Sequence, residues 1–223
     1  MLSWEKKAFL SGTSIVIGVD EAGRGPLAGP VVAGAVMLQR TPLRSLNRIP
    51  AYNSRIDDSK KLRPDQRDRA FEEISRKAIF GIGLKDNKRI DRINIHMATL
   101  EAMKQAVKKL VSEFCRLNGK KEKDIRNDIC VLVDGVFGNF LPYKTIPIIK
   151  GDSKSLSIAA ASIMAKVTRD RIMDAYGRKY PVYGFSKHKG YGTKFHMEAI
   201  GQYGPCLIHR KSFAPMKNDI REN

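Results

Sequence analysis

Three short apolar segments of this chain each run directly into acidic residues. The segments are 14–19, 129–133 and 145–149, and β-branched runs of this length predict buried strands. Aspartate is a poor strand former, and open α/β sheets carry their sites at the carboxyl ends of strands. We therefore expect one edge of a sheet to gather four carboxylates, those of Asp20, Glu21, Asp134 and Asp152.

Each of these acids also has a simpler interpretation as a turn residue. Asp134-Gly135 suits a turn well, whereas Asp20 beside Glu21 suits one less well because neighbouring like charges repel. Together, clustered carboxylates in a cationic protein favour a divalent metal site, since hard oxygen ligands select Mg²⁺ or Mn²⁺. Two such ions about 3.5–4 Å apart can activate a water and stabilise the leaving oxygen of a phosphodiester.

The rest of the chain predicts strands that alternate with helices. Two further strands are expected at 30–38 and 79–84. Helices are expected at 64–77, 93–117, 155–178 and 193–202, with an irregular connection over 39–63 and a charged loop over 119–127. This order indicates the α/β fold class, with a mixed sheet at its centre.

We expect a single domain over residues 1–223. Its core should span about 14–180, with a small C-terminal helical and loop extension over about 181–223. The basic tail after His209 is expected to show local disorder. The apolar stripe of the long helix predicts that Met97, Phe114 and Leu117 lie in the core.

The charge balance points to a polyanionic partner. Lys and Arg number 41 against 23 Asp and Glu, which gives a net charge of +18 and favours nucleic acid. A generically basic protein is the alternative, and charge alone does not separate an enzyme from a ribosomal or architectural protein. A near-match to the dinucleotide fingerprint at Gly23, Gly25 and Gly29 follows two acids that would repel a pyrophosphate, so no small-molecule cofactor is expected.

The cysteines and the hydropathy favour a cytoplasmic protein that does not enter the membrane. Three cysteines without a Cys-x-x-Cys motif argue against a zinc site or a disulfide framework, and we expect them to be buried and inert. We see neither a signal-peptide pattern nor an apolar run of about 18 residues. The histidines, which we interpret as loop or packing residues, are His96, His188, His196 and His209.

Several motifs, in their order and spacing, resemble the ribonuclease HII family over roughly residues 15–215. They are Val19-Asp20-Glu21-Ala22-Gly23-Arg24-Gly25-Pro26-Leu27-Ala28-Gly29-Pro30, Asp58-Ser59-Lys60-Lys61-Leu62, Asn94-Ile95, Val133-Asp134-Gly135, Lys150-Gly151-Asp152, the helical block 159–170, His188-Lys189-Gly190-Tyr191-Gly192-Thr193-Lys194 and His209-Arg210-Lys211-Ser212-Phe213. A lone Gly-Arg-Gly would mean little, but the whole series is highly specific.

The resemblance implies a ribonuclease H-like fold with a mixed five-stranded sheet flanked by helices. It implies cleavage of RNA–DNA hybrids, and of duplex DNA on the 5′ side of an embedded ribonucleotide, leaving 3′-hydroxyl and 5′-phosphate ends. Asp20 is expected to bridge two Mg²⁺ or Mn²⁺ ions, Glu21 and Asp134 to ligate one ion each, directly or through water, and Asp152 to complete the set.

The resemblance also implies substrate-binding roles. The backbone of Gly23, Arg24 and Gly25 is expected to recognise the ribose 2′-hydroxyl, because glycine lets the main chain come close to a sugar. Tyr191 is expected to stack on the next deoxyribose and read the RNA-to-DNA junction. Phosphate contacts are expected from Lys60 and Asn94, while Lys166 and Lys189 are weaker candidates and Asp170 is interpreted as structural.

Three rival interpretations remain. The sister family, ribonuclease HIII, usually carries an extra N-terminal domain and Gly-Lys-Gly, whereas position 24 here is Arg. A non-catalytic nucleic-acid-binding protein would explain the charge but not the acids, and an unrelated nuclease would not explain Tyr191. No Gln-x-x-Leu-x-x-Phe-Phe motif is visible at the C-terminus, so docking to a replication clamp is not expected, and we expect a monomer. The loop 39–57 is longer than is usual for the family.

Overall fold

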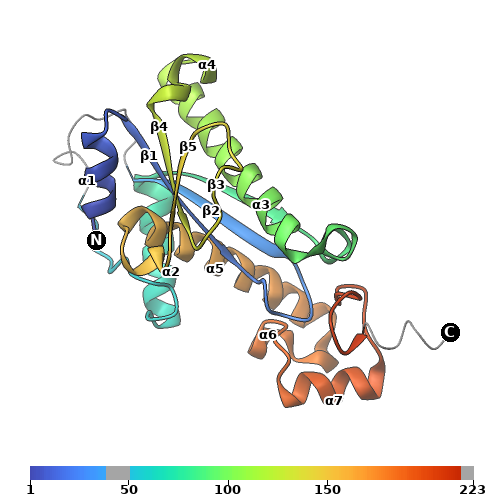
Figure 1. The fold of residues 1–223 in the computed structure, drawn as a ribbon. Coiled ribbons are helices and arrows are strands. Elements are labelled where there is room, and N and C mark those ends of the chain that lie inside the picture. Colours follow the sequence, from blue (N-terminus) through green and yellow to red (C-terminus); the bar gives the residue numbers. More distant parts are fainter. Residues whose placement is uncertain (39–50, 217–223) are drawn as a thin grey trace.

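Five strands form a mixed sheet in the computed structural model, which describes residues 1–38 and 51–216 (Figure 1). They are β1 (Ile15–Ala22), β2 (Val31–Met37), β3 (Ile79–Lys85), β4 (Ile129–Asp134) and β5 (Lys144–Ile148). Their order across the sheet is β3-β2-β1-β4-β5. The β1–β2 and β2–β3 pairs are antiparallel, whereas β1–β4 and β4–β5 are parallel. The expected mixed five-stranded α/β sheet is confirmed.

Helices cover both faces of this sheet. They are α1 (Ser3–Leu10), α2 (Pro64–Lys77), α3 (Asn87–Asn118), α4 (Glu122–Ile125), α5 (Leu156–Lys179), α6 (Phe185–His188) and α7 (Lys194–Tyr203). Side chains alternate between the faces along β1, as the pleat requires. Ile17 and Val19 pack in one buried cluster with Phe114 of α3, whereas Val16 packs with Ile158 of α5 in another.

The alanine-rich sequence of α5 lets that helix lie directly on the sheet backbone. A Cβ atom added to Gly34 of β2 would sit 2.5 Å from the carbonyl oxygen of Ala161. Small residues on both sides of this contact are therefore required, because any larger side chain would push the helix away. The helix also carries Arg169 toward the loop that follows β1.

Beyond α5 the chain forms a small helical extension, seen at the lower right of Figure 1 around α6 and α7. Its buried side chains pack in one cluster with Ala28 of the loop after β1 and Met173 of α5, and they are Tyr183, Phe185, Ala199, Ile200, Ile208 and Met216. Backbone hydrogen bonds join it to the loop after β1, from Leu27 N–H to Gly190 and from Gly29 N–H to Ile208. The extension therefore supports the end of the sheet where the acids lie.

Three histidines that stand apart in the sequence meet inside this extension. The rings of His188 and His196 stack with centroids 4.5 Å apart, and His196 Nε2 lies 3.0 Å from His209 Nε2. The N–H of Cys206 donates to His209 Nδ1, so neutral His209 donates from Nε2 to His196, which in turn donates from Nδ1 to the carbonyl of Tyr191. As expected, these rings are packing residues.

Several details of the chain differ from the sequence-based expectation. The segment 119–127 is not only a loop: it holds α4 and the start of a 3₁₀ turn (Arg126–Asp128), because the buried Ile125 anchors it to the core. Met97 and Leu117 are 46% and 49% exposed, so their expected burial is wrong, whereas Phe114 is buried. The helical stripe is broken upstream of Met97 by non-helical torsions at Asn94.

The expected disorder after His209 is wrong for the described part of the tail. Arg210 is fully buried and Met216 is 2% exposed, because both pack against the extension and the loop after β1. Residues 217–223 and most of the 39–57 loop lie outside the described residues. The boundary placed near residue 180 stays a prediction.

The three cysteines are free thiols. Cys130 is buried as expected, whereas Cys115 and Cys206 are only partly buried, so their expected burial is wrong. Burial raises the pKa of Cys130 to about 11 and also raises the pKa values of the partly buried Cys115 and Cys206. All three thiols are therefore protonated at neutral pH, which agrees with their expected inertness. None of the helices in the described part of the chain has the length and apolar composition needed to cross a bilayer.

Candidate active site

Strand register brings the acids to one end of the sheet. Val19 pairs with Val133 across the parallel β1–β4 ladder, so Asp20 and Asp134 extend from neighbouring strands at the same level. Asp20 and Glu21 lie inside β1 and Asp134 is the last residue of β4, whereas the sequence analysis placed them just beyond the strands. Asp152 lies in the 3₁₀ turn Gly151–Ser153, shortly after β5.

Three of the acids have a polar contact with a neighbouring backbone N–H or ammonium group. Asp20 Oδ1 accepts a 2.7 Å hydrogen bond from the N–H of Glu21, and Asp134 Oδ1 accepts one of 2.6 Å from Gly151. Asp152 Oδ2 lies 3.7 Å from the ammonium of Lys60. These contacts leave at least one oxygen of Asp20 and Asp134 unused by any described hydrogen bond.

Glu21 has an unsatisfied buried oxygen. Its Oε1 lies 3.3 Å from Arg24 Nη1, but its Oε2 is buried and has no hydrogen-bond partner among the described residues. A buried carboxylate oxygen without a donor or cation is costly, and Oε2 of Glu5, which is not one of these four acids, is in the same state. At Glu21 a bound cation would satisfy the oxygen.

The electrostatics of the cluster oppose full ionisation of the bare carboxylates. Burial, reinforced by the charges of Glu21 and Asp134, raises the pKa of Asp20 well above its usual value. Burial also raises the pKa of Glu21 and, together with neighbouring acids, that of Asp152. Burial lowers the pKa of Lys60, but the carboxylates of Asp152 and others nearby outweigh it and raise that pKa. A divalent cation would relieve this repulsion.

The donor set fits hard divalent cations, although the side chains are not drawn together. Within residues 1–38 and 51–216, no three His, Cys, Asp or Glu side chains stand close enough to hold an ion as they are placed. The unpartnered Glu21 oxygen and the all-carboxylate character of the cluster suit Mg²⁺ or Mn²⁺.

The Gly-Arg-Gly turn and Tyr191 lie side by side next to these acids. A Cβ atom added to Gly25 would be 3.7 Å from Tyr191 Cε1, which is ordinary van der Waals contact. Tyr191 is 49% exposed, so its ring is open to a ligand. Arg24 connects the turn to the acids through Glu21 and also lies over the ring of Phe137, with 5.3 Å from Cζ to the ring centroid.

Lys60 and Asn94 occupy different surroundings. Lys60 lies at the acids, with an 81% exposed side chain. Asn94 interrupts α3 with φ 67° and ψ 165°, and its Oδ1 accepts from the N–H of Met97 and so caps the following helical segment. Such a torsion is rare for a residue other than glycine and costs about 1–3 kcal/mol, which makes the position notable.

The weaker phosphate candidates are engaged by carboxylates. Lys166 lies 2.7 Å from Asp170, and Lys189 pairs with Asp174. Asp170 therefore has a structural ion pair with Lys166, which agrees with its interpretation as a structural residue.

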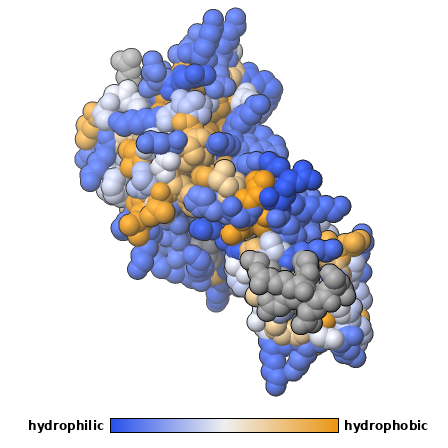
Figure 2. Space-filling model, turned by 45° about the vertical axis from the view of Figure 1, so that its right-hand side comes forward, coloured by the Kyte–Doolittle hydropathy of each residue, from blue (hydrophilic) through white to orange (hydrophobic). Residues whose placement is uncertain are grey.

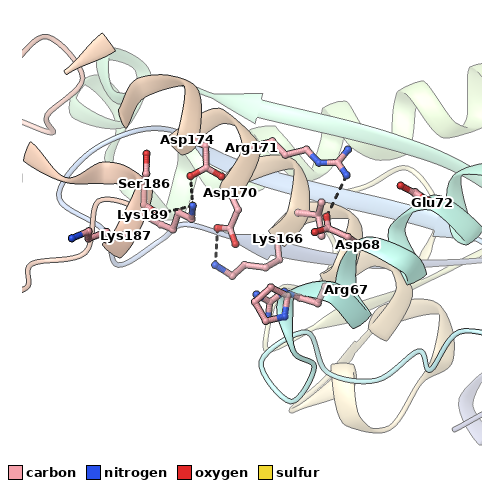
Figure 3. Close-up of a pocket in the computed structure, with 12 residues that line it drawn as sticks. Arg67, Asp68, Glu72, Lys166, Asp170, Arg171, Asp174, Ser186, Lys187 and Lys189 are labelled. Atoms are coloured by element: carbon pink, nitrogen blue, oxygen red, sulfur yellow. Dashed lines mark hydrogen bonds and ion pairs between the residues drawn. The ribbon is translucent and has the colours of Figure 1, made fainter. Parts of the chain in front are cut away.

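A cavity of about 740 Å³ lies between α2, α5 and α6, away from the four acids (Figure 3). Its lining carries both signs of charge, and three ion pairs neutralise these charges locally: Lys166–Asp170, Arg171–Asp68 and Lys189–Asp174. We assign no function to this cavity. The face drawn in Figure 2 is mostly hydrophilic, with hydrophobic residues in scattered patches.

Sequence reasoning missed two buried arginines, Arg169 and Arg210. Arg210 donates to the carbonyls of Gly23 and Arg24 in the Gly-Arg-Gly turn, whereas Arg169 donates to those of Ala28 and Pro30 in the segment that follows the turn. The one sequence feature that pointed to them was their position inside two of the family motifs. Residue type gave no indication of burial, because arginine is usually exposed.

Comparisons with known proteins agree with one another. Residues 17–216 match the family model described as Ribonuclease HII. A relative named Ribonuclease HII, from Caldanaerobacter subterraneus subsp. tengcongensis, is 47% identical over 214 residues, which cover 96% of this chain and 79% of the relative.

Solved structures share the fold. The ribonuclease H2 from Pyrococcus horikoshii OT3 has a TM-score of 0.64 and 26% identity, and the match covers 94% of this chain and all of that one. Bst-RNase HIII in complex with Mn²⁺ has a TM-score of 0.66 over 96% of this chain and 72% of that one, but its 18% identity supports the fold alone. The expected ribonuclease H-like fold is confirmed.

Proposed function

This chain belongs to the ribonuclease HII family, and we propose that it cuts duplex DNA on the 5′ side of an embedded ribonucleotide as well as RNA–DNA hybrids. It is a ribonuclease H, a divalent-metal-dependent hydrolase that acts as an endoribonuclease on such hybrids. The proposed products carry 3′-hydroxyl and 5′-phosphate ends. This activity would serve the removal of ribonucleotides from DNA during replication and repair.

The juxtaposition of Gly25 and Tyr191 carries this proposal. A Cβ on Gly25 would approach Tyr191 Cε1 to 3.7 Å, so the turn and the exposed ring form one surface. Arg24 joins that surface to the acids by its 3.3 Å contact with Glu21. A ribose held at the turn would lie close to the acids, and the ring would meet the next sugar. The 2′-hydroxyl is the group that distinguishes RNA from DNA at such a site.

Asp20, Glu21, Asp134 and Asp152 would hold Mg²⁺ or Mn²⁺, with Asp20 shared between two ions. Bound ions of this kind supply an activated water and neutralise charge on the departing oxygen. The unsatisfied Oε2 of Glu21 and the raised pKa of Asp20, due to burial, support this assignment. Lys60 and Asn94 would contact backbone phosphates of the duplex.

Two alternative functions predict different results on the same duplexes. A ribonuclease HIII-like enzyme would cut long hybrids but act poorly on a single ribonucleotide, and a non-catalytic protein would bind duplexes without cutting. Arg24, in place of the lysine of the sister family, favours the first proposal. A cytoplasmic location and a monomeric state remain predictions.

A matched set of duplexes tests the proposal. One position carries a ribonucleotide, a 2′-O-methyl nucleotide or a deoxynucleotide in otherwise identical DNA, and a long hybrid serves as reference. We expect cleavage of the ribonucleotide duplex and of the hybrid only. Cleavage of the hybrid alone would support the sister activity, cleavage of all duplexes would remove the role of the 2′-hydroxyl, and binding without cleavage would support the non-catalytic alternative.

A further inference from the structure

Two buried guanidinium groups lie beneath the Gly-Arg-Gly turn. Arg210, from the C-terminal extension, is fully buried and donates to the carbonyls of Gly23 (2.6 Å), Arg24 (2.8 Å) and Gly29 (3.0 Å). Arg169, from α5, is 1% exposed. It donates to the carbonyls of Pro30 (3.0 Å), Ala28 (3.2 Å) and Lys189 (3.0 Å). Five of the six bonds thus end on residues 23–30.

Neither guanidinium forms an ion pair with a carboxylate in the described part of the chain. Burial lowers the pKa of Arg169 to about 10, and burial with the nearby charge of Arg169 lowers that of Arg210 to about 9, so both stay charged at neutral pH. Arg210 also lies over the ring of Phe213, with 5.0 Å from Cζ to the ring centroid. A buried charge without a paired carboxylate is costly, and an apolar side chain often fills such a volume at lower cost. A requirement other than stability would account for the two arginines.

Peptide geometry indicates that requirement. In a trans peptide, the carbonyl of one residue and the N–H of the next point in opposite directions. Because Arg210 fixes the carbonyls of Gly23 and Arg24 inward, the N–H groups of Arg24 and Gly25 are directed away from it. Neither N–H donates to another group among the described residues. Both therefore remain available to an oxygen atom of a ligand.

Arg169 packs against Gly23 of the same turn and donates to carbonyls of the segment that follows it. A Cβ atom added to Gly23, whose φ is +96°, would lie 2.0 Å from Arg169 Nε, so this glycine is needed for the arginine itself. Close packing against Arg169 therefore requires glycine at position 23, independently of any close approach by a sugar. Arg169 also holds the carbonyl of Lys189, and Leu27 N–H donates to Gly190, so the turn and the Tyr191 loop are fixed as one unit.

We propose that Arg210, supported by Arg169, is a positioning residue that sets ribonucleotide specificity by aiming the N–H groups of Arg24 and Gly25 at the ribose 2′-hydroxyl. This inference rests on the proposed function. It concerns residues that touch neither the acids nor the substrate and act through the backbone of the turn.

The test compares Arg210→Lys with wild type on duplexes that carry one ribonucleotide or one 2′-fluoro nucleotide. Lysine keeps the charge but cannot donate to three carbonyls in a fixed plane. We expect kcat on the ribonucleotide duplex to fall by about tenfold or more, as for a lost hydrogen bond to the reacting sugar, with KM within about threefold. The ratio of the cleavage rate on the ribonucleotide duplex to that on the 2′-fluoro duplex should fall by a similar factor.

Arg171→Lys is the matched control, because Arg171 lies on α5 but is exposed and pairs with Asp68. It should behave as wild type. Arg210→Gln is the second variant, since its amide still donates to a carbonyl, and denaturant midpoints show whether each variant folds.

An unchanged preference in a folded variant would overturn the proposal. So would a raised KM with unchanged kcat, which would mean lost duplex binding, or a failure of both Arg210 variants to fold, which would make the arginine a stability residue only. A wild-type enzyme that does not prefer the ribonucleotide would instead overturn the proposed function, whatever the variants do.

Discussion

The Oδ1 atom of Asp134 accepts a 2.6 Å hydrogen bond from the backbone N–H of Gly151. This bond ties the last residue of β4 to the turn that carries Asp152, and so spaces two of the four acids. Asparagine retains an amide oxygen that can accept the same bond but carries no negative charge. Asp134→Asn therefore separates the structural role of this residue from its electrostatic role.

We expect Asp134→Asn and Asp20→Asn each to slow hybrid cleavage by about a hundredfold or more, because metal-ion charge stabilisation is worth several kcal/mol. Hybrid affinity, measured by fluorescence anisotropy in EDTA, should remain near that of wild type. Asp170→Asn is the matched control, since Asp170 pairs with Lys166 away from the acids. Wild-type cleavage rates in the two acid variants would remove these carboxylates from the mechanism.

Tyr191→Ala should impair cutting at a single embedded ribonucleotide more than cutting of a long hybrid. Because the ring is exposed, its removal should change the folding stability little. The effect should therefore appear in the cleavage rate and not in the denaturant midpoint. Tyr191→Phe, which removes only the hydroxyl, separates stacking from hydrogen bonding. Parallel loss on both substrates in initial-rate assays would argue against a junction-reading role.

The histidine cluster predicts a loss of stability on mild acidification. Burial, with the neighbouring His196, lowers the pKa of His209 to about 4, whereas an unfolded histidine titrates near pH 6.5. Between these values the unfolded chain binds the extra proton. The contribution is therefore fully present above about pH 6.5 and lost as the pH falls toward 4, by up to about 3 kcal/mol.

Urea unfolding at pH 7.5 and pH 5 measures this effect. His209→Gln should show a smaller difference between the two pH values than wild type. If both proteins lose the same stability, carboxylates elsewhere account for the pH dependence and the buried histidine does not.

The charge of +18 predicts a steep salt dependence of duplex binding. Affinity for a hybrid should fall by orders of magnitude between about 50 and about 200 mM salt if several phosphates are contacted. Lys60→Ala should lower the slope of log affinity against log salt by about one unit if it contacts one phosphate. An unchanged slope would argue against a phosphate contact of Lys60 and would leave only its ion pair with Asp152.

The sequence was sufficient to predict the strands, the longer helices and the end of the sheet near which the acids lie. Apolar runs rich in β-branched residues predicted all five strands, and helices were predicted where α2, α3, α5 and α7 lie, but α1, α4 and α6 were not predicted. The register of β1 and β4 was not predictable in this way, because both strands are buried on both faces. Asn94 was predicted as a phosphate contact, but its helix-breaking torsion depends on tertiary context and was not foreseeable.

The buried arginines could not be predicted because no residue pattern shows which carbonyls a distant side chain will meet. Arg210 lies 187 positions from Gly23 in the sequence. It also lies in the tail that was expected to be disordered, so no buried role was predicted for it. The histidine contacts have the same character, since His196 and His209 are brought together only by the path of the extension. Such long-range polar contacts depend on packing and not on local propensity.

Cleavage mapping of a DNA duplex with one ribonucleotide, resolved on a sequencing gel in Mg²⁺, Mn²⁺ or EDTA, tests the central claim most directly. We predict a single cut on the 5′ side of the ribonucleotide in either metal, with a 5′-phosphate on the downstream product, and none in EDTA. A cut on the other side, a cut that persists in EDTA, or no cut in a duplex that the protein binds would contradict the account.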